Sequence, residues 1–323
     1  MTTRTLLTLA LAAGACVAQR VSLTDIDARL SITEKTREQI GIRHWYPVRQ
    51  AVEVPNSSGQ PSLLEFDGHS MWVAGTDGSI NRFQAGDLTL LNSLSFTANF
   101  TAMAGDGRNI WVADFNSSKV FRIAQDPFAL TGSFDIGGTG TIAMAFDGTY
   151  MWCANSDSNN LSKIRASDGT LVAVFPLPGS PQGIVFDGSN LWVTNGTHSQ
   201  VMKISTSDGS VLASYQVGTD PFSLLFDGEN IWTANQSGSV TKLRAADGAI
   251  LGTFPVTAVP QAMTFDGVSI WVSNTGVGSV TRLRASDGST MGVFSVNAAP
   301  FAMAFDGVNI WATDSAFGHV VLF

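Results

Sequence analysis

The sequence is poor in cysteine, histidine and charged residues. Its 323 residues include 2 cysteines, Cys16 and Cys153, and 4 histidines, and charged side chains make up 14% of the chain. One cysteine lies close to the N-terminus, so we expect no internal disulfide and a core that is held together by packing. Motifs for a Gly-rich phosphate loop, a paired-cysteine metal site or an activated nucleophile are also missing from the sequence.

Basic residues are outnumbered by acidic ones. The 18 Lys and Arg residues stand against 26 Asp and Glu residues, which gives a formal net charge of −8. Nucleic acids and anionic lipid surfaces bind through a basic face, so neither is an expected partner. The chain is rich in hydrophobic residues instead, at 44% of the total with 20 Phe and 8 Trp. This composition excludes disorder and predicts a large core.

The first residues are typical of a secretory signal peptide. Arg4 precedes a short apolar run at 6–15, and small residues follow up to Ala18. The run is too short to span a bilayer and no later run approaches that length, so we expect no transmembrane span. Removal of residues 1–18 on export predicts a secreted or periplasmic protein. Cys16 leaves a lipid-anchored form open as an alternative, because a lipid on this cysteine would tether the mature chain.

Residues 19–47 separate this signal from the repeats that follow. Ser22 is typical of a helix N-cap, and Leu23, Ile26 and Leu30 mark one apolar face. The segment is interpreted as a short helix packed on the following domain, as an oligomerisation segment or as a tether. Its apolar stripe is shorter than the heptad array of a coiled coil. We expect the protein to be a monomer.

Seven of the 8 tryptophans recur at intervals of 39 to 41 residues. The same phrase surrounds each of them: a short apolar segment, an Asp-Gly pair, two variable residues, an apolar residue and the tryptophan. Self-similarity at this period is the signature of a repeat architecture. The tryptophans stand at positions 72, 111, 152, 192, 232, 271 and 311.

Each copy is predicted to form four short antiparallel strands, A to D. In the copy that begins at residue 221, strand A ends at Phe226, an Asp-Gly hairpin turn follows, and strand B contains Trp232. A second Asp-Gly turn, at 247–248, joins strands C and D. Four such strands in about 40 residues are the unit of a propeller blade. The sequence therefore predicts an all-β fold, a seven-bladed β-propeller over residues 48–323.

The last copy predicts how the ring closes. It ends at Phe323 after three strands, and residues 48–54 match the pattern of the missing strand D. We therefore expect this N-terminal strand to pair with 319–323 and to complete the last blade, as three strands plus one. Such a closure hides the sheet edges that an open array exposes.

Residues that recur in every copy are interpreted as parts of the blade. The tryptophans are expected in the core, and large and small residues of strand A are expected to interlock with neighbouring blades. Gly105 replaces the Phe that ends strand A in the other copies, and Phe100 is expected to fill the gap. The strand C cations are interpreted as structural; they are Arg82, Arg122, Lys163, Lys203, Lys242 and Arg282.

The repeated phrase also carries a family likeness. Asp-Gly-x-x-Ile-Trp-Val-Ala-Asn resembles the repeats of bacterial secreted propellers of the YVTN and NHL types and is similar to the repeat of streptogramin B lyases. The likeness covers 48–323 and implies a propeller, a fold that hosts binding modules, scaffolds and a few enzymes. For the lyases it implies metal-assisted elimination with His and Glu near magnesium. The sequence shows no matching arrangement, since its histidines stand in unlike repeat contexts: His44, His69, His198 and His319.

Functional candidates are the residues that depart from the repeat on the face formed by the B-to-C loops and the loops that enter strand A. Phe115 and Phe317 replace polar residues there and are predicted to form an apolar lip for a ligand. His198 is a candidate to bind a metal or to move protons. Glu65 is the only charge predicted within an inner strand. It is interpreted as a carboxylate lining the channel or as a strand-end residue that reaches water.

Side-chain oxygens are expected on the same face. Asn or Asp closes strand B in six copies, and these residues are interpreted as Asx turns that bond their own backbone. The alternative is a ring of oxygens that holds a divalent cation, calcium or magnesium, at the channel mouth. The candidate metal ligands are Asp77, Asp114, Asp157, Asp220 and Asp314.

The uniformity of the blades favours a non-catalytic role, because it leaves few special residues for catalysis. We expect an exported binding or interaction module for a protein, a glycan or a surface ligand. The alternative is a metal-dependent lyase or hydrolase that resembles streptogramin B lyase. In a third interpretation the ring is a scaffold that presents residues 19–47.

Overall fold

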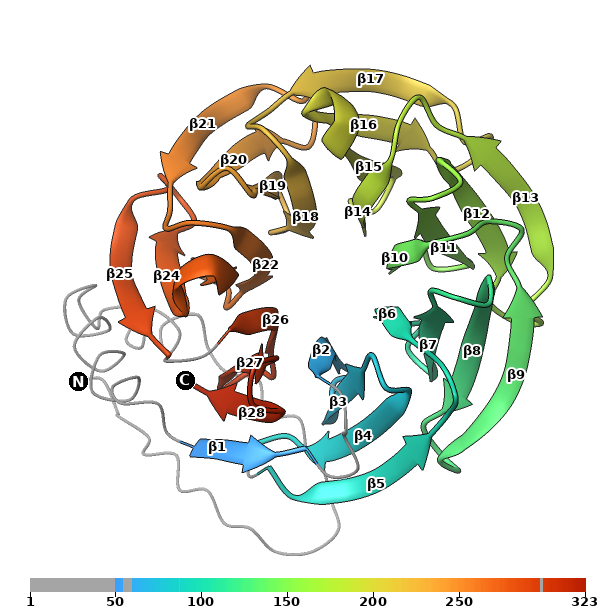
Figure 1. Ribbon diagram of the computed structural model, residues 1–323. Coiled ribbons are helices and arrows are strands. Elements are labelled where there is room, and N and C mark those ends of the chain that lie inside the picture. The colour runs from blue at the N-terminus through green and yellow to red at the C-terminus, as the bar shows by residue number, and fades with distance from the viewer. Residues whose placement is uncertain (1–49, 55–59, 87, 297–298) are drawn as a thin grey trace, which may run out of the picture. The chain divides into compact units, whose positions relative to one another are not determined.

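The computed structural model describes residues 50–54, 60–86, 88–296 and 299–323. The expected signal peptide 1–18, the segment 19–47 and Cys16 lie outside these residues. The described strands belong to one compact unit, Pro47–Phe323, and form seven four-stranded sheets around a common axis (Figure 1). This arrangement confirms the predicted all-β, seven-bladed propeller.

Six blades consist of four consecutive strands, A to D. Blade 1 contains β2 (Pro61–Phe66), β3 (Ser70–Gly75), β4 (Ser79–Gln84) and β5 (Leu90–Ser95). Blade 2 contains β6 (Phe100–Gly105), β7 (Asn109–Asp114), β8 (Lys119–Ala124) and β9 (Ala129–Asp135). Blade 3 contains β10 (Thr141–Phe146), β11 (Tyr150–Asn155), β12 (Asn160–Arg165) and β13 (Leu171–Pro176).

The next three blades follow the same plan. Blade 4 contains β14 (Pro181–Phe186), β15 (Asn190–Asn195), β16 (Gln200–Ser205) and β17 (Val211–Gln216). Blade 5 contains β18 (Pro221–Phe226), β19 (Asn230–Asn235), β20 (Ser239–Arg244) and β21 (Ile250–Pro255). Blade 6 contains β22 (Pro260–Phe265), β23 (Ser269–Asn274), β24 (Ser279–Arg284) and β25 (Thr290–Ser295).

The seventh blade combines both ends of the described chain. It contains β26 (Pro300–Phe305), β27 (Ile310–Asp314) and β28 (His319–Leu322), and its fourth strand is β1 (Gln50–Glu53). The antiparallel register of β1 and β28 joins residue 50 to residue 322 and residue 53 to residue 319. The expected strand 48–54 is therefore found beside the C-terminal strand, and residues 48 and 49 lie outside the described chain.

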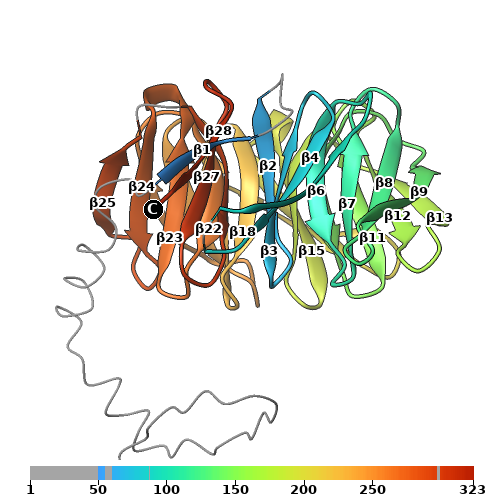
Figure 2. The ribbon, with the colours of Figure 1, turned by 90° about the horizontal axis from the view of Figure 1, so that it is seen from below.

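The strands of each blade run along the ring axis, with strand A at the centre and strand D at the rim (Figures 1 and 2). The B-to-C loops and the loops that enter strand A lie at one end, here called the upper face, and the Asp-Gly turns lie at the other. Two B-to-C loops contain single 3-10 turns, η1 (Gly196–His198) and η2 (Thr275–Val277). Within the described part of the chain, no helix is long and apolar enough to cross a membrane.

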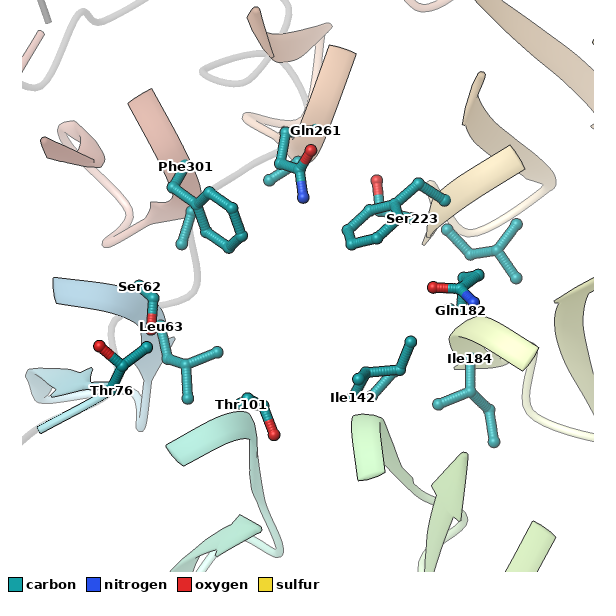
Figure 3. A pocket seen from close by; sticks show the side chains of 16 residues that line it. Ser62, Leu63, Thr76, Thr101, Ile142, Gln182, Ile184, Ser223, Gln261 and Phe301 are labelled. Atoms are coloured by element: carbon teal, nitrogen blue, oxygen red, sulfur yellow. The ribbon is translucent and has the colours of Figure 1, made fainter. Parts of the chain in front are cut away.

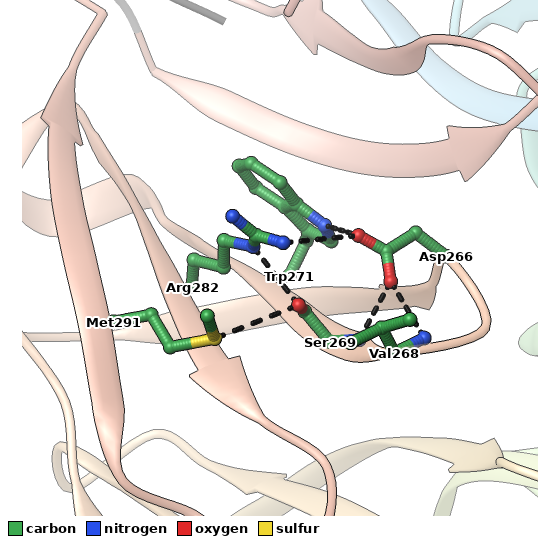
Figure 4. Close-up of polar contacts among 6 residues, drawn as sticks. All are labelled: Asp266, Val268, Ser269, Trp271, Arg282 and Met291. Atoms are coloured by element: carbon green, nitrogen blue, oxygen red, sulfur yellow. Dashed lines mark hydrogen bonds and ion pairs between the residues drawn. The ribbon is translucent and has the colours of Figure 1, made fainter. Parts of the chain in front are cut away.

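One contact recurs in all seven blades: the aspartate of the first turn accepts hydrogen bonds from the strand B tryptophan and from the turn backbone. In blade 6, Asp266 Oδ2 accepts from the Trp271 indole N–H at 2.7 Å, and Oδ1 accepts from the N–H groups of Val268 and Ser269 (Figure 4). The seven indoles are fully buried, so the predicted core role of the tryptophans is confirmed. The other pairs are Asp67–Trp72, Asp106–Trp111, Asp147–Trp152, Asp187–Trp192, Asp227–Trp232 and Asp306–Trp311.

The strand C cations join neighbouring blades. Lys203 Nζ lies 5.0 Å from the centroid of the Trp192 ring and donates to the Ala245 carbonyl of blade 5 at 2.8 Å. All six such cations contact the indole of their own blade, and five of them also donate to the backbone of the next blade, which confirms their structural role. Equivalent bonds to the next blade start from Arg82, Arg122, Lys163 and Lys242.

Removing one of the turn aspartates should destabilise the ring. In Asp227→Ala, the buried Trp232 indole and two backbone N–H groups lose their acceptor, so we expect a loss of about 2–4 kcal/mol. The measurement is the free energy of unfolding in urea. Asp247→Ala is the matched control, since Asp247 is the exposed aspartate of the second turn in the same blade, and its loss should destabilise the protein much less than the loss of Asp227. Equal losses in the two variants would contradict the prediction.

Candidate functional site

Every inner strand is irregular near its second residue. In blade 4 the ladder between β14 and β15 skips Gln182 and Gly183, and their backbone N–H groups donate to the Thr194 hydroxyl at 3.2 and 2.7 Å. The other six blades show register shifts at the same place. Such bulges re-aim side chains, and here the second residue of each strand A lines the axis. These residues, the axial ring, are Ser62, Thr101, Ile142, Gln182, Phe222, Gln261 and Phe301.

The axial ring and the residues next to it line a cavity of about 310 Å³ in the upper part of the channel (Figure 3). The volume is at the lower end of the range of small-molecule sites. None of the lining residues is charged, and most are apolar, with the aromatic rings of Phe222 and Phe301 among them. The polar side chains of the cavity are those of Ser62, Thr76, Thr101, Gln182, Ser223 and Gln261.

Two carboxamides in the cavity are oriented by their neighbours. Gln182 Nε2 donates to Ser180 Oγ at 2.9 Å, and the Ser180 hydroxyl itself donates to the Ser156 carbonyl. Gln182 therefore turns its amide oxygen to the cavity. Gln261 has the opposite orientation, because its Oε1 accepts from Gln236 Nε2 at 3.0 Å and its nitrogen points toward the cavity centre (Figure 3). The cavity thus offers one hydrogen-bond acceptor and one donor in fixed positions.

Two serine hydroxyls beside the cavity are buried without a partner. Ser62 is 8% exposed, and neither its Oγ nor that of Ser223 makes a hydrogen bond within the described chain. An unsatisfied buried hydroxyl is costly, and such groups are commonly satisfied by water or a ligand. Both residues line the cavity. Their Oγ atoms, however, are almost inaccessible, so these hydroxyls do not face a ligand in the cavity as the two carboxamides do.

The upper face is acidic. Among the described residues, Lys119 is the one Lys or Arg at this end, and its Nζ pairs with the Asp135 carboxylate at 2.9 Å. The aspartates at this end are Asp77, Asp114, Asp135, Asp157, Asp220 and Asp314. The remaining described Lys and Arg residues lie in strand C or in the lower turns, as the strand bounds show.

Three apolar side chains are exposed on the upper loops of blades 6 and 7. Phe317 is 66% exposed, Val277 is 55% exposed and Val259 is 36% exposed, each on an upper loop. Val259 has φ 57°, a left-handed conformation that β-branched residues rarely adopt. Strained residues of this kind are concentrated at functional sites. We call these three side chains the apolar rim.

The structure places the predicted lip residues apart from each other in the ring. Phe317 belongs to blade 7 and is strongly exposed, whereas Phe115 belongs to blade 2 and is half-buried. The exposed His198 lies in blade 4, where its Nδ1 is 3.2 Å from Asn195 Oδ1. The Phe317 ring stacks on His319, with 6.5 Å between the ring centroids. None of these side chains lines the axial cavity.

The predicted metal ligands lie on five different upper loops. Asp77, Asp114 and Asp314 accept hydrogen bonds from backbone N–H groups of their own loops, as in Asx turns. Asp157 and Asp220 are exposed. Among the described residues, no three His, Cys, Asp or Glu side chains are close enough together to hold one metal ion.

Glu65 lies between blades 1 and 2. Its Oε1 accepts from the Gly105 N–H at 3.0 Å, and a Cβ added to Gly105 would meet this carboxylate first. The expectation that Phe100 fills the gap at Gly105 is wrong, because Phe100 lies at the other end of the strand and packs on Phe96 and Phe121. Burial raises the pKa of Glu65 to about 7; the Gly105 N–H lowers it and the charge of Asp67 raises it.

Sequence reasoning missed the axial ring, although a signal for it exists. The second residue of strand A is Ser, Thr, Ile, Gln or Phe in different copies, while the tryptophan three residues from the end of strand B never changes. A position that varies among otherwise uniform copies is free of blade packing. The sequence alone does not reveal that a bulge turns this position to the axis.

The ring geometry is shared with several solved propellers. The chain has the fold of streptogramin B lyase. It is 16% identical to that protein with a TM-score of 0.72, over 85% of this chain and 96% of the lyase. A hydrazine synthase chain of Kuenenia stuttgartiensis is 15% identical with a TM-score of 0.72, over 84% and 97% of the two chains. The Cps50 (Swd1) β-propeller domain of Myceliophteria thermophila is 12% identical with a TM-score of 0.74, over 85% and 99%.

At these sequence identities the likeness shows the propeller fold, not a shared activity or ligand. No protein-family model matches the chain, and no curated protein sequence matches it either. The likeness to YVTN and NHL repeats therefore stays a prediction from the repeated phrase.

Glu65 should make stability depend on pH. In the folded protein the Glu65 carboxyl keeps its proton up to about pH 7. In the unfolded chain it releases the proton near its ordinary pKa of 4.5. The contribution of Glu65 to the free energy of unfolding is therefore largest below pH 4.5. It falls by up to about 3 kcal/mol as the pH rises to 7. Urea unfolding of the wild type and Glu65→Gln across this range measures the difference. Parallel pH profiles for the two proteins would refute the prediction.

Proposed function

We propose that the protein is an exported binding module that takes an uncharged ligand group into the axial cavity. The observation that carries the proposal is the uncharged, mostly apolar lining with one oriented acceptor on Gln182 and one oriented donor on Gln261. Few, well-placed polar groups in an apolar cleft are typical of sites that recognise a ligand. Export is supported by the N-terminal sequence 1–18, with lipid attachment at Cys16 as its alternative.

The uniform blades suit this role. Blades 1 to 5 are each joined to the next blade by a cation that contacts an indole and a backbone carbonyl, so the side chains of the axial ring are held on a rigid support. A preorganised cavity loses little entropy when a ligand enters. Amides, hydroxyls and hydrocarbon side chains orient and desolvate a ligand, which is the task of a binding module.

Three ring compounds of similar size test the cavity. Benzamide, benzoate and benzylamine differ chiefly in charge, and saturation-transfer NMR reports which of them contacts the protein. We expect binding of benzamide and at least about 10-fold weaker binding of benzoate and benzylamine, because the cavity offers no opposite charge to a buried ion. Ile142→Trp, which fills the cavity, should abolish the benzamide signal, and Gln84→Met at the exposed lower end should not change it. Benzamide binding that survives Ile142→Trp would exclude the cavity as the site.

A metal-dependent lyase or hydrolase is the second candidate, suggested by the fold that the chain shares with streptogramin B lyase, and metal binding by the aspartates of the upper face tests it. Such an enzyme binds calcium or magnesium through Asp157 and Asp220 or their neighbours on this face. Binding at a concentration of 100 times the dissociation constant stabilises a protein by about 2.7 kcal/mol. If the binding-module proposal is right, millimolar calcium or magnesium leaves the melting temperature unchanged. A rise of several degrees that disappears in Asp157→Asn/Asp220→Asn would favour the enzyme instead.

A further inference from the structure

We infer that the ligand is a segment of a partner protein that inserts one uncharged apolar side chain into the axial cavity and lays Lys or Arg residues over the acidic upper face. The inference rests on the proposed function and names its ligand. Four features of the structure support it: the cavity lining, the two oriented amides, the apolar rim and the distribution of charge.

The cavity selects an apolar, uncharged group. Its walls include the rings of Phe222 and Phe301 and the aliphatic side chains of Leu63 and Ile142, and none of its lining residues is charged. A charge moved into such surroundings without a partner is strongly disfavoured. An aromatic or aliphatic side chain that enters the cavity removes its apolar surface from water, which stabilises the complex. Such anchors in pockets dominate the energetics of protein interfaces.

The two amides match a peptide backbone. Gln182 turns an oxygen toward the cavity and Gln261 turns a nitrogen toward it, each held by a neighbour that occupies the other end of the amide (Figure 3). A peptide group carries one N–H donor and one carbonyl acceptor. The N–H of the inserted segment can therefore donate to Gln182, and its carbonyl can accept from Gln261.

The apolar rim extends the contact beyond the cavity. Val259, Val277 and Phe317 are exposed on blades 6 and 7, the blades that contribute Gln261 and Phe301 to the axial ring. Exposed apolar side chains around a buried anchor keep water from it in protein interfaces. Because the rim lies on one part of the upper face, the partner is expected to leave the cavity over blades 6 and 7.

The charges of the upper face favour a basic partner. Asp157 and Asp220 are exposed there, and the one described Lys of this end, Lys119, is already paired with Asp135. Acidic surfaces speed the association of basic partners and exclude acidic ones. The lysines or arginines lie beside the inserted side chain and stay at the solvent-exposed surface.

Labelled pentapeptides test the inference. The probes are fluorescein-tagged Lys-Gly-Xaa-Gly-Lys with Leu, Phe, Asn or Asp at Xaa, and fluorescence anisotropy measures their affinity for the full-length protein. We expect the Leu and Phe peptides to bind at least about 10-fold more tightly than the Asp peptide. Replacing both Lys residues of the Leu peptide by Glu should weaken binding by a further factor of about 10.

Variants assign each contact. Ile142→Trp should abolish binding of the Leu peptide, and Gln182→Met, which keeps the side-chain shape but removes the acceptor, should weaken it by about 2- to 10-fold. Phe317→Ser should weaken it without changing the melting temperature, since the side chain is 66% exposed. Asp157→Asn/Asp220→Asn should lower the affinity and flatten its dependence on salt. Gln84→Met is the control that should bind like the wild type.

Several results would overturn the inference. Benzamide binding without peptide binding leaves the proposed function intact and removes the protein partner as the ligand. Displacement of benzamide by maltotriose, with no effect of any peptide, would assign the cavity to a glycan instead. Peptide binding that does not depend on Xaa, or that survives Ile142→Trp, would show that no side chain enters the cavity.

Discussion

The propeller depends on a hydrogen bond between a turn aspartate and a buried indole. In each blade the carboxylate accepts from the indole N–H and from two backbone N–H groups, as Asp227 does in blade 5. This contact fixes the A-to-B hairpin and gives a buried polar group its partner. The indole in turn supports the strand C cation, here Lys242, which reaches the next blade. A local turn is thereby coupled to the assembly of the ring.

The same coupling explains where the chain is free to vary. Strand B carries the buried indole, and strand C carries the cation that contacts this indole and the next blade. Most of strand A packs against neighbouring sheets. The bulge at the second residue of strand A releases one side chain per blade to the axis. Ligand recognition can therefore be built from seven positions without disturbing the contacts that hold the ring together. The cavity and its oriented amides are the outcome.

Glu65 and Gly105 both depart from the repeat, and they contact each other in the structure. Gly105 lacks the Phe of the other copies, and the Glu65 carboxylate lies against it and accepts its N–H. The sequence marks both residues as unusual but does not pair them, because they are separated by one full repeat and meet only when blades 1 and 2 pack. Burial between the blades then raises the pKa of Glu65.

The sequence by itself determined the all-β class, the number of blades, their four-strand plan and the strand that completes the last blade. Periodic tryptophans and Asp-Gly turns are local signals, and a sevenfold repeat of a local signal leaves few alternative folds. Only the tertiary structure decided which side chains meet at the axis. The residues of the axial ring lie about 40 positions apart in the sequence. A bulge directs their side chains to the axis, and no residue type predicts this bulge. Closure of the ring, rather than proximity along the chain, makes them neighbours.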